Sequence, residues 1–389
     1  MQEEIARVTR IFQNEDLSRP VTSAQDVPPS YDAITDEWLT DAICAQSPGA
    51  RVTGHRFDER DDGSSNRRRI FVEYNDAGEA AQFPPTVFCK AAETLNNRLV
   101  TGLSRAAEIE ADFYNQVRGR IAFEAPQSIY AKFDTNSYAS LIMLRDLGSS
   151  VSFCDDRTEV TRAMAEQQIV TLANLHARFY DSDELGSKDL PFLTWPDWWA
   201  RMMDASPDFA ACCDAAFVES EDNMPARLFA RRHEIWNATM QSVERHNHLP
   251  KTLIHCDVHL KNWYHCASGT MGLSDWQITS IGHWSRDLIY TMTTALTVEN
   301  RRAWEQDLVR LYLDLMEERG VPREPLDQVW LNLRQQLMTA LAFWTITLHP
   351  AQGMPDMQPL RTTRVFLNRL LTAIDDHESL DAFGQGAAG

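Results

Sequence analysis

The chain has 389 residues, 43% of them hydrophobic, which is enough for two lobes that each bury a core. Its net charge of −19 keeps the protein soluble and argues against nucleic acid or an anionic membrane as a partner, and no apolar run is long enough to cross a bilayer. Seven cysteines without a C-x-x-C pair give neither a disulfide framework nor zinc-site spacing, and the charged N-terminus lacks a secretory apolar core, so we expect a cytoplasmic location.

Residues 1–34 mix helical and loop signals with proline breakers, which predicts an extension packed on the surface. Thr35 then caps a short predicted helix that runs through Trp38 to Ile43.

From residue 51 to residue 90 the pattern changes to strands. Two runs of β-branched and aromatic residues are separated by a predicted turn, and the second run ends in Lys90. The polar loop 61–66 precedes the first of these runs and contains Ser64 and Ser65. Backbone N–H groups and hydroxyls of such a loop can bind phosphate oxygens, and an ordinary solvent-exposed hairpin turn is the alternative.

Helical spacing of apolar residues begins again at Ala106 and continues to Val117, with Glu108 and Glu110 on this segment and Ser104 as its predicted cap. An apolar strand over residues 138–146 follows. Beyond it the pattern is mostly helical, and the expected helices cover residues 159–180, 208–219, 224–246, 300–319, 326–348 and 358–377.

The segment 181–250 contains a cluster of tryptophans, Trp195, Trp198 and Trp199. These rings either stack on a flat or cationic substrate or fill the core, and the core is the preferred interpretation. His176, on the preceding helix, is interpreted as a packed, hydrogen-bonded histidine.

The densest polar stretch places His255, Asp257, His259 and Asn262 within eight residues, and a turn and a strand-like run then lead to Asp275. Asp and Asn at this spacing occur in the catalytic loop of kinases. One carboxylate orients and deprotonates the attacking hydroxyl, while an amide oxygen and a second carboxylate hold Mg²⁺ on the phosphates. The alternative is that the aspartate caps a turn and the asparagine bonds its own backbone.

This pattern resembles the aminoglycoside phosphotransferase and choline kinase-like family of small-molecule kinases. The family loop reads H-G-D-x-H-x-x-N and is followed by I-D-W or a similar motif; here the sequences are HCDVHLKN (255–262) and SDW (274–276). Cys256 and Lys261 stand where the family has glycines. The resemblance covers residues 35–375 and implies a two-lobed, protein kinase-like α+β fold, with a small antiparallel-sheet lobe and a mainly helical large lobe.

The resemblance implies that Asp257 is the catalytic base and that Asn262 and Asp275 are the metal ligands. His255 and His259 are interpreted as scaffolding of the loop rather than as catalysts. Asp287, in the later motif W-S-R-D-L, matches a family aspartate that organises the catalytic loop.

In the small lobe the resemblance assigns Lys90 to the nucleotide phosphates and selects Glu110 as its partner. Glu108 is the second candidate for the partner of Lys90. The alternative is that both glutamates are solvated charges on the helix surface. We expect the pair to be partly exposed, with a small effect on stability. The same resemblance makes Ser64 and Ser65 part of the loop that covers the nucleotide.

The resemblance places the hinge near residues 143–147, so Met143 and Leu144 are expected to bond the base through their backbone. Arg145 replaces a family glutamate here, and the base is adenine or guanine. The expected domains are an N-terminal extension (1–34), an N-lobe (35–147), a C-lobe (148–378) with a substrate-binding insertion (181–250), and a disordered tail (379–389).

The predicted function is transfer of the γ-phosphate of ATP, or of GTP, to a hydroxyl of a small acceptor with Mg²⁺. The acceptor class is open and includes aminoglycosides, amino alcohols, sugars and other alcohols. A nucleotide-binding pseudokinase or scaffold is the alternative, because the loop is poor in glycine and Cys256 departs from the family pattern. A protein kinase is disfavoured, since no D-F-G or A-P-E motif is present.

Overall fold

The computed structural model describes residues 1–350 and 357–384. Contacts divide the chain into two compact units. The first unit comprises Met1–Arg120 and Pro126–Ser149, and the second comprises Ile121–Ala125 and Ser150–Gly389.

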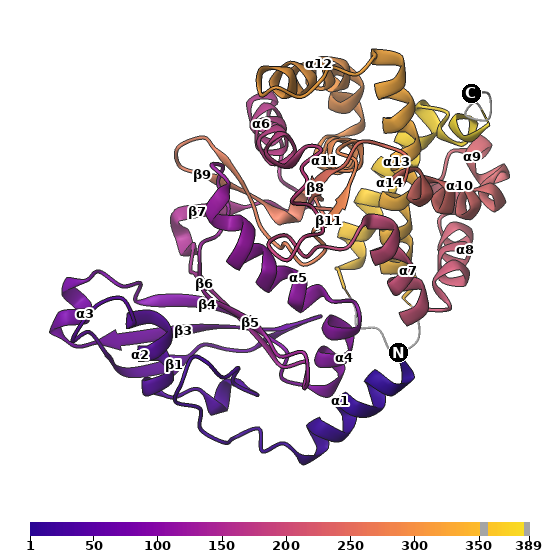
Figure 1. Ribbon diagram of the computed structural model, residues 1–389. Helices are drawn as coiled ribbons and strands as arrows, with labels where there is room; N and C mark the ends of the chain where they lie inside the picture. The colour runs from indigo at the N-terminus through magenta and orange to yellow at the C-terminus, as the bar shows by residue number, and fades with distance from the viewer. Residues whose placement is uncertain (351–356, 385–389) are drawn as a thin grey trace. The chain divides into compact units, whose positions relative to one another are not determined.

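The first unit is built on an antiparallel sheet with the strand order β1-β3-β4-β6-β5, and β2 pairs with β3 at its edge (Figure 1). Residues 69–74 and 86–90 form strands as predicted, because β-branched and aromatic side chains pack well on a pleated, half-buried surface. The strands are β1 Val52–Phe57, β2 Asp61–Asp62, β3 Asn66–Tyr74, β4 Thr86–Ala91, β5 Ser128–Phe133 and β6 Ser140–Arg145.

The helices of this unit follow the predicted starts in part. The Thr35 hydroxyl accepts from the N–H of Trp38 and caps α2, as expected. Ser104 instead ends α4, and Arg105 in a left-handed conformation precedes α5. The helices are α1 Gln2–Asn14, α2 Asp36–Cys44, α3 Asp76–Ala80, α4 Leu95–Leu103 and α5 Ala106–Asp112, with one π-helical turn at Phe113–Val117 and 3₁₀ turns at Tyr31–Ala33 and Arg118–Arg120.

The turn predicted between the two strand runs is helix α3. The Asn75 side chain accepts from the N–H of Gly78, and this N-cap makes a short helix out of a segment that reads as a turn. Local side-chain to backbone bonds of this kind are common to both structures, which explains the error.

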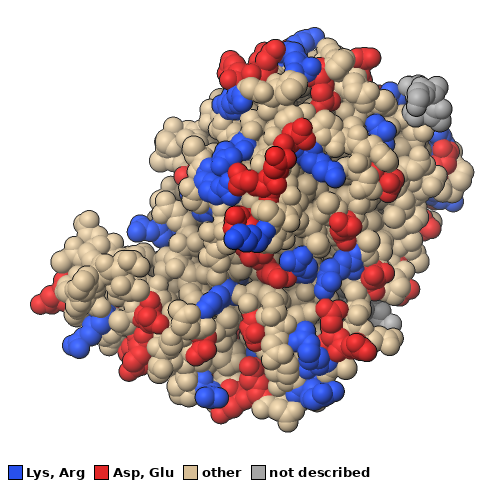
Figure 2. Space-filling model, viewed as in Figure 1, with Lys and Arg blue, Asp and Glu red and all other residues tan. Residues whose placement is uncertain are grey.

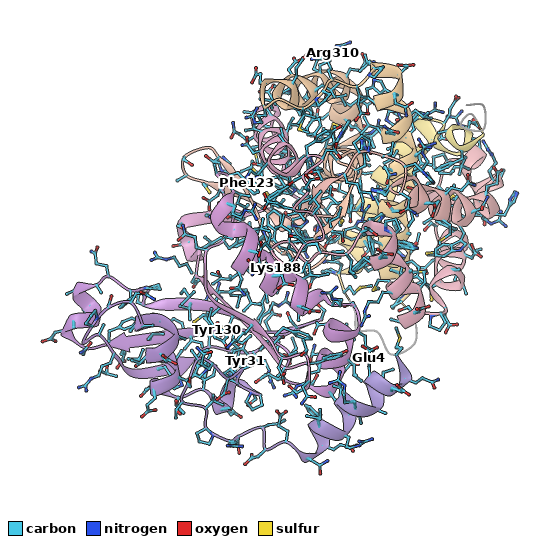
Figure 3. The ribbon with its side chains drawn as sticks, in the orientation of Figure 1. Glu4, Tyr31, Phe123, Tyr130, Lys188 and Arg310 are labelled. Carbon is cyan, nitrogen blue, oxygen red and sulfur yellow. The ribbon has the colours of Figure 1, made fainter. Side chains whose placement is uncertain are left out.

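The core of the first unit lies between the sheet and α2. Side chains alternate along β4, so Val87, Cys89 and Ala91 face inward. Tyr31 and Tyr130, both labelled in Figure 3, contribute to this cluster from outside the central strands. The burial of this face is what fixes the register of the sheet.

The N-terminal residues pack on the same unit. Val8 of α1 is buried against Leu103 of α4 and Tyr138, and the Tyr138 hydroxyl donates to Glu4 at 3.0 Å. The first helix is therefore joined to the chain around α4 by both apolar and polar contacts.

The second unit is mainly helical (Figure 1). Its small sheets have the orders β10-β9-β7 and β11-β8, all antiparallel. The helices are α6 Arg162–Phe179, α7 Trp195–Ala205, α8 Phe209–Glu219, α9 Ala226–Ala230, α10 Arg232–Arg245, α11 Ser285–Ala295, α12 Val298–Glu318, α13 Leu326–Leu348 and α14 Leu360–Asp376. The strands are β7 Val151–Phe153, β8 Thr252–Ile254, β9 Trp263–Cys266, β10 Met271–Leu273 and β11 Ser280–Gly282.

Helix α11 lies in the centre of the second unit. Every residue from Ser285 to Ala295 is buried, and α6, α13 and α14 pack around it. Trp195, Trp198 and Trp199 are also buried, and the first two stack at 5.3 Å between ring centroids. The core interpretation of this cluster is therefore confirmed.

The predicted disordered tail is only partly within the described residues. Residues 379–383 form a 3₁₀ turn in which Ser379, Leu380 and Ala382 are buried, so this part is ordered, contrary to the expectation. Leu380 and Ala382 supply the apolar contacts that order it. The remaining five residues, 385–389, lie outside the described residues.

Charged side chains of both signs are interspersed on the face shown in Figure 2. Within residues 1–350 and 357–384, no helix combines the length and the apolar composition needed to span a bilayer. The antiparallel sheet of the first unit and the helical second unit confirm the predicted α+β class.

Candidate active site

The polar loop after β8 is held by the buried carboxylate of Asp287 on α11. This carboxylate accepts from the backbone N–H of His255 at 2.6 Å and of Cys256 at 2.9 Å, and it contacts Nε2 of His176 at 3.3 Å. Burial alone would raise the pKa of Asp287, but the hydrogen bond and charge of His176 and the loop outweigh it and hold the pKa below its usual value. The predicted organising role of Asp287 is confirmed.

Cys256 has a left-handed backbone, with φ of +68°, and a fully buried side chain. This conformation explains why a glycine is common here, since only glycine adopts it without a steric cost. The neighbouring Arg286, itself buried, donates from Nη2 to the carbonyl oxygen of Cys256 at 2.8 Å. Burial raises the pKa of the Cys256 thiol, so it is not a reactive thiolate.

Asp257 follows this strained residue, and its carboxylate is fixed from two sides. The Nδ2 group of Asn262 donates to the Asp257 carbonyl at 2.7 Å and to its carboxylate at 3.2 Å. The hydroxyl of Tyr290, on α11, hydrogen-bonds the same carboxylate and accepts from the indole N–H of Trp344 at 2.8 Å. The carboxylate is thus oriented by an amide and a phenol.

The two histidines of the loop are buried and act as scaffolding, as predicted. Nδ1 of His255 accepts from the N–H of Asp257 at 3.1 Å, and its Nε2 donates to the carbonyl of Ser274 at 3.1 Å. The ring of His259 packs edge-on against Trp344, with its Nε2 at 3.6 Å from the Asp257 carboxylate. Burial lowers the pKa of both imidazoles, which keeps them neutral.

Asn262 and Asp275 are brought together through the residue between β10 and Asp275. Both the N–H and the hydroxyl of Ser274 donate to the carbonyl of Asn262 at 2.9 Å. The amide nitrogen of Asn262 is committed to Asp257, so its Oδ1 is the atom available to a cation. An amide oxygen and a carboxylate are hard oxygen ligands of the kind Mg²⁺ prefers, and the residues therefore fit the ion.

The predicted pair of Lys90 and Glu110 is formed within the first unit. The Lys90 ammonium lies 2.8 Å and 2.9 Å from the two carboxylate oxygens of Glu110. Glu108 instead pairs with Arg105 at 2.7 Å. The side chains of Lys90 and Glu110 are only 12% and 4% exposed, so the pair is more buried than expected and its loss should affect stability.

Ser64 and Ser65 lie in the turn between β2 and β3. The register pairs Asp62 with Asn66 across this turn and Arg67 with Lys90 on the next strand. The turn therefore lies at the same end of the sheet as the ammonium group.

Met143 and Leu144 lie inside β6, with β4 on one side and β5 on the other. In a central antiparallel strand the N–H and C=O groups point to the two neighbouring strands. The backbone of these two residues is therefore occupied by the sheet, and the chain first leaves it at Asp146, whose carboxylate pairs with Arg69 at 2.9 Å. This placement differs from the expectation for the hinge.

Sequence reasoning missed two residues of the second-unit site, Arg286 and Tyr290. Both lie on α11: Arg286 is part of the W-S-R-D-L motif, which was recognised only through Asp287, and Tyr290 lies two residues after that motif. The helical period of buried and exposed residues does not reveal them, since every residue of α11 is buried. Their polar groups lie beneath the loop only in the tertiary structure.

A comparison with protein-family models matches residues 61–324 to the phosphotransferase enzyme family (APH). The match covers more than half of the chain, and the protein belongs to this family. The family resemblance drawn from the loop motif is thereby confirmed.

An uncharacterized kinase-like protein of Caenorhabditis elegans is 24% identical over 212 residues, which are 52% of this chain and 54% of that protein. The chain thus spans about half the length of this curated relative. Among solved structures, an ethanolamine kinase of Plasmodium vivax is 12% identical, with 82% of this chain and 81% of that chain covered and a TM-score of 0.48. A choline kinase of Streptococcus pneumoniae is 13% identical, with 84% and 94% covered and a TM-score of 0.44.

Proposed function

We propose that the protein is a Mg²⁺-dependent small-molecule kinase, which transfers the γ-phosphate of ATP or GTP to a hydroxyl group. The observation that carries the proposal is the fixed carboxylate of Asp257, bonded by Asn262 and Tyr290 directly after a clamped, left-handed residue. Membership of a phosphotransferase family supports the same chemistry.

Asp257 is the proposed base. Its carboxylate orients the acceptor hydroxyl and takes the proton as the acceptor oxygen bonds to the γ-phosphorus. The bond from that phosphorus to the β–γ bridging oxygen breaks, and the nucleoside diphosphate leaves with that electron pair. Orientation by two neutral donors fits this role because neither removes the negative charge of the carboxylate.

Asn262 and Asp275 are the proposed metal ligands, through Oδ1 and the carboxylate. Bound Mg²⁺ would supply neutralisation of phosphate charge. The left-handed backbone of Asp275, with φ of +68°, sets the direction of its carboxylate. Neutral His255 and His259 add no competing positive charge beside this group.

In the first unit, Lys90 is proposed to bind the α and β phosphates, with Glu110 fixing its ammonium group. Ser64 and Ser65 are proposed to bind phosphate through the turn between β2 and β3. For the base, we propose the segment that follows β6, from Asp146, in place of Met143 and Leu144, whose backbone groups face neighbouring strands.

The test is consumption of ATP and of GTP by the purified protein with Mg²⁺, across a panel of amino alcohols, sugars and aminoglycosides. The matched blank is Asp257→Asn, which keeps the size of the side chain. Acceptor-dependent formation of nucleoside diphosphate and of a phosphorylated acceptor is the expected result. Tight nucleotide binding with no turnover on any acceptor would instead favour the nucleotide-binding scaffold.

A further inference from the structure

Asn97, a buried residue of α4, hydrogen-bonds through its side chain to the turn between β2 and β3. Its Nδ2 lies 2.8 Å from the carbonyl oxygen of Gly63 and 2.8 Å from that of Ser64. The two hydrogens of one amide nitrogen thus serve two successive carbonyl groups, and the side chain is only 6% exposed.

The orientation of this amide is fixed from the helix side. Thr94, the N-cap of α4, accepts from the backbone N–H of Asn97 at 3.1 Å, and its hydroxyl donates to Oδ1 of the same residue. The oxygen is therefore turned to the cap and the nitrogen to the turn. No rotation about the last bond of Asn97 satisfies both sets of partners in any other way.

The two hydrogen bonds from Asn97 determine where the N–H groups of the turn point. In a planar trans peptide the C=O and N–H groups point in opposite directions. Gly63 C=O shares a peptide with Ser64 N–H, and Ser64 C=O shares one with Ser65 N–H. Because both oxygens face α4, both N–H groups face away from it, and neither has a hydrogen-bond partner within residues 1–350 and 357–384.

Two successive unpaired N–H groups on one side of a turn form an anion-binding concavity. The turn contains a single glycine, Gly63, so its shape does not depend on a run of flexible residues. A further hydrogen bond holds the C-terminal end of the turn, where Oδ1 of Asn66 accepts from the backbone N–H of Glu93 at 2.9 Å. The turn is thus held by side chains instead of by glycine.

We propose that Asn97 is a positioning residue for the nucleotide phosphates, which presents the N–H groups of Ser64 and Ser65 to the anion. The inference rests on the proposed function, because it takes the anion to be the phosphate chain of a nucleoside triphosphate. Asn97 itself does not touch the nucleotide; it replaces the conformational control that a glycine-rich loop would need.

The experiment is equilibrium binding of ATP, GTP and the two corresponding nucleosides to the full chain. Asn97→Ala removes both hydrogen bonds to the turn. Asn97→Asp removes them as well and also turns a carboxylate oxygen towards the two carbonyl groups. Both should weaken triphosphate binding, the second by about 10- to 100-fold, the range for losing hydrogen bonds to a charged group. Binding of the nucleosides should be unchanged, since they carry no phosphate.

Asn96→Asp is the matched control, because Asn96 is the exposed neighbour on the same helix turn and receives the same charge. It should bind triphosphate within about twofold of the wild type, as surface changes usually do. Equal weakening by Asn96→Asp, or an equal loss of nucleoside and triphosphate binding by Asn97→Asp, would overturn the proposal.

A second measurement uses the wild type and does not depend on folding of a variant. Hydrogen exchange at Ser64 and Ser65 should be slowed by the triphosphate that binds and not by its nucleoside. Triphosphate binding without slower exchange at these amides overturns the role of Asn97 and leaves the kinase proposal intact. A wild type that binds neither triphosphate contradicts the kinase proposal itself.

Discussion

Arg286 donates from its buried guanidinium to the carbonyl oxygen of Cys256 at 2.8 Å. This hydrogen bond holds Cys256, the residue with a left-handed backbone that precedes Asp257. The guanidinium carbon lies 4.1 Å from the ring centroid of Trp195 and Nη1 donates to Thr339 at 2.8 Å. The loop that contains Asp257 is thus held by a cation that is itself held by side chains of α7 and α13.

The left-handed conformation predicts an unusual order of stability at Cys256. Cys256→Gly should be more stable than Cys256→Ala by about 1–2 kcal/mol, because only glycine avoids the steric cost of φ at +68°. Urea denaturation measures the difference. The control is Cys89, buried in β4, where the glycine variant should be the less stable one. The same order at both positions would contradict the prediction.

Asp257→Asn should lower kcat by about 10²–10⁴-fold, the range for loss of a general base. Nucleotide affinity should change little, since the proposed nucleotide contacts lie on other residues. Tyr290→Phe removes only the hydroxyl that orients this carboxylate, so it should lower kcat less and leave the KM for nucleotide unchanged. Steady-state kinetics on an identified acceptor measures both. Wild-type turnover by Asp257→Asn would refute its assignment as the base.

The ion pair in the first unit predicts separate effects on stability and on activity. Lys90→Met leaves the buried carboxylate of Glu110 without its ammonium partner, which should cost about 3–5 kcal/mol of unfolding free energy. Adding Glu110→Gln should recover part of that stability, because the uncompensated charge is removed. Activity should not recover, since the ammonium group that is proposed to bind the phosphates is still absent.

Thermal denaturation and kcat/KM for nucleotide are the two measurements for the pair. Glu108→Gln is the matched control, because Glu108 lies on the same helix and pairs with Arg105 instead. It should leave kcat/KM unchanged. Losses in kcat/KM from Lys90→Met and Glu110→Gln that multiply as independent effects would show that the two residues do not act together.

Metal binding is expected to depend on nucleotide. Within the described parts of the chain, 1–350 and 357–384, no group of three or more His, Cys, Asp and Glu side chains can hold an ion by itself. The proposed ligands Asn262 and Asp275 would supply two oxygen atoms, and Mg²⁺ usually takes its remaining ligands from phosphate and water. Calorimetric titration should show weak binding to the protein alone and tighter binding with nucleotide. Tight binding without nucleotide would count against these two residues as the ligand set.

His246 predicts loss of stability on mild acidification. Burial lowers its pKa to about 3, and its Nδ1 accepts from the N–H of His283 while Nε2 donates to Gln336. The unfolded chain, with an imidazole pKa near about 6.5, therefore binds a proton that the folded chain does not. The stability is fully present above that value and falls as pH decreases towards 3, by up to about 1.4 kcal/mol per pH unit.

Urea denaturation at pH 7, 6 and 5 measures this slope, and His246→Gln should make it shallower. Asp112 acts in the opposite direction, since burial raises its pKa to about 6 and its protonated form stabilises the fold as pH falls towards the ordinary carboxyl value. The comparison of His246→Gln with the wild type cancels this contribution. An unchanged slope in the variant would contradict the assignment.

The sequence alone predicted the α+β class, the phosphotransferase family and most residues of the candidate site. Alternating and helical patterns located most strands and helices, because each element buries one face and its residues show that period. The spacing from Asp257 to Asn262 and the later Asp275 identified the candidate second-unit site, and one strand-end lysine with Glu110 gave the ion pair. These are local signals, carried by residues close together in the chain or by a family motif.

Only the tertiary structure decided what holds those residues. Tyr290 and Arg286 contact the loop from α11, and Asn97 contacts the turn before β3 from α4. Such contacts join elements that are far apart in the sequence, and no periodic pattern of residues predicts which of these elements meet. The same reason explains Met143 and Leu144: the sequence shows a strand, but only the sheet order shows that neighbours on both sides take up its backbone groups.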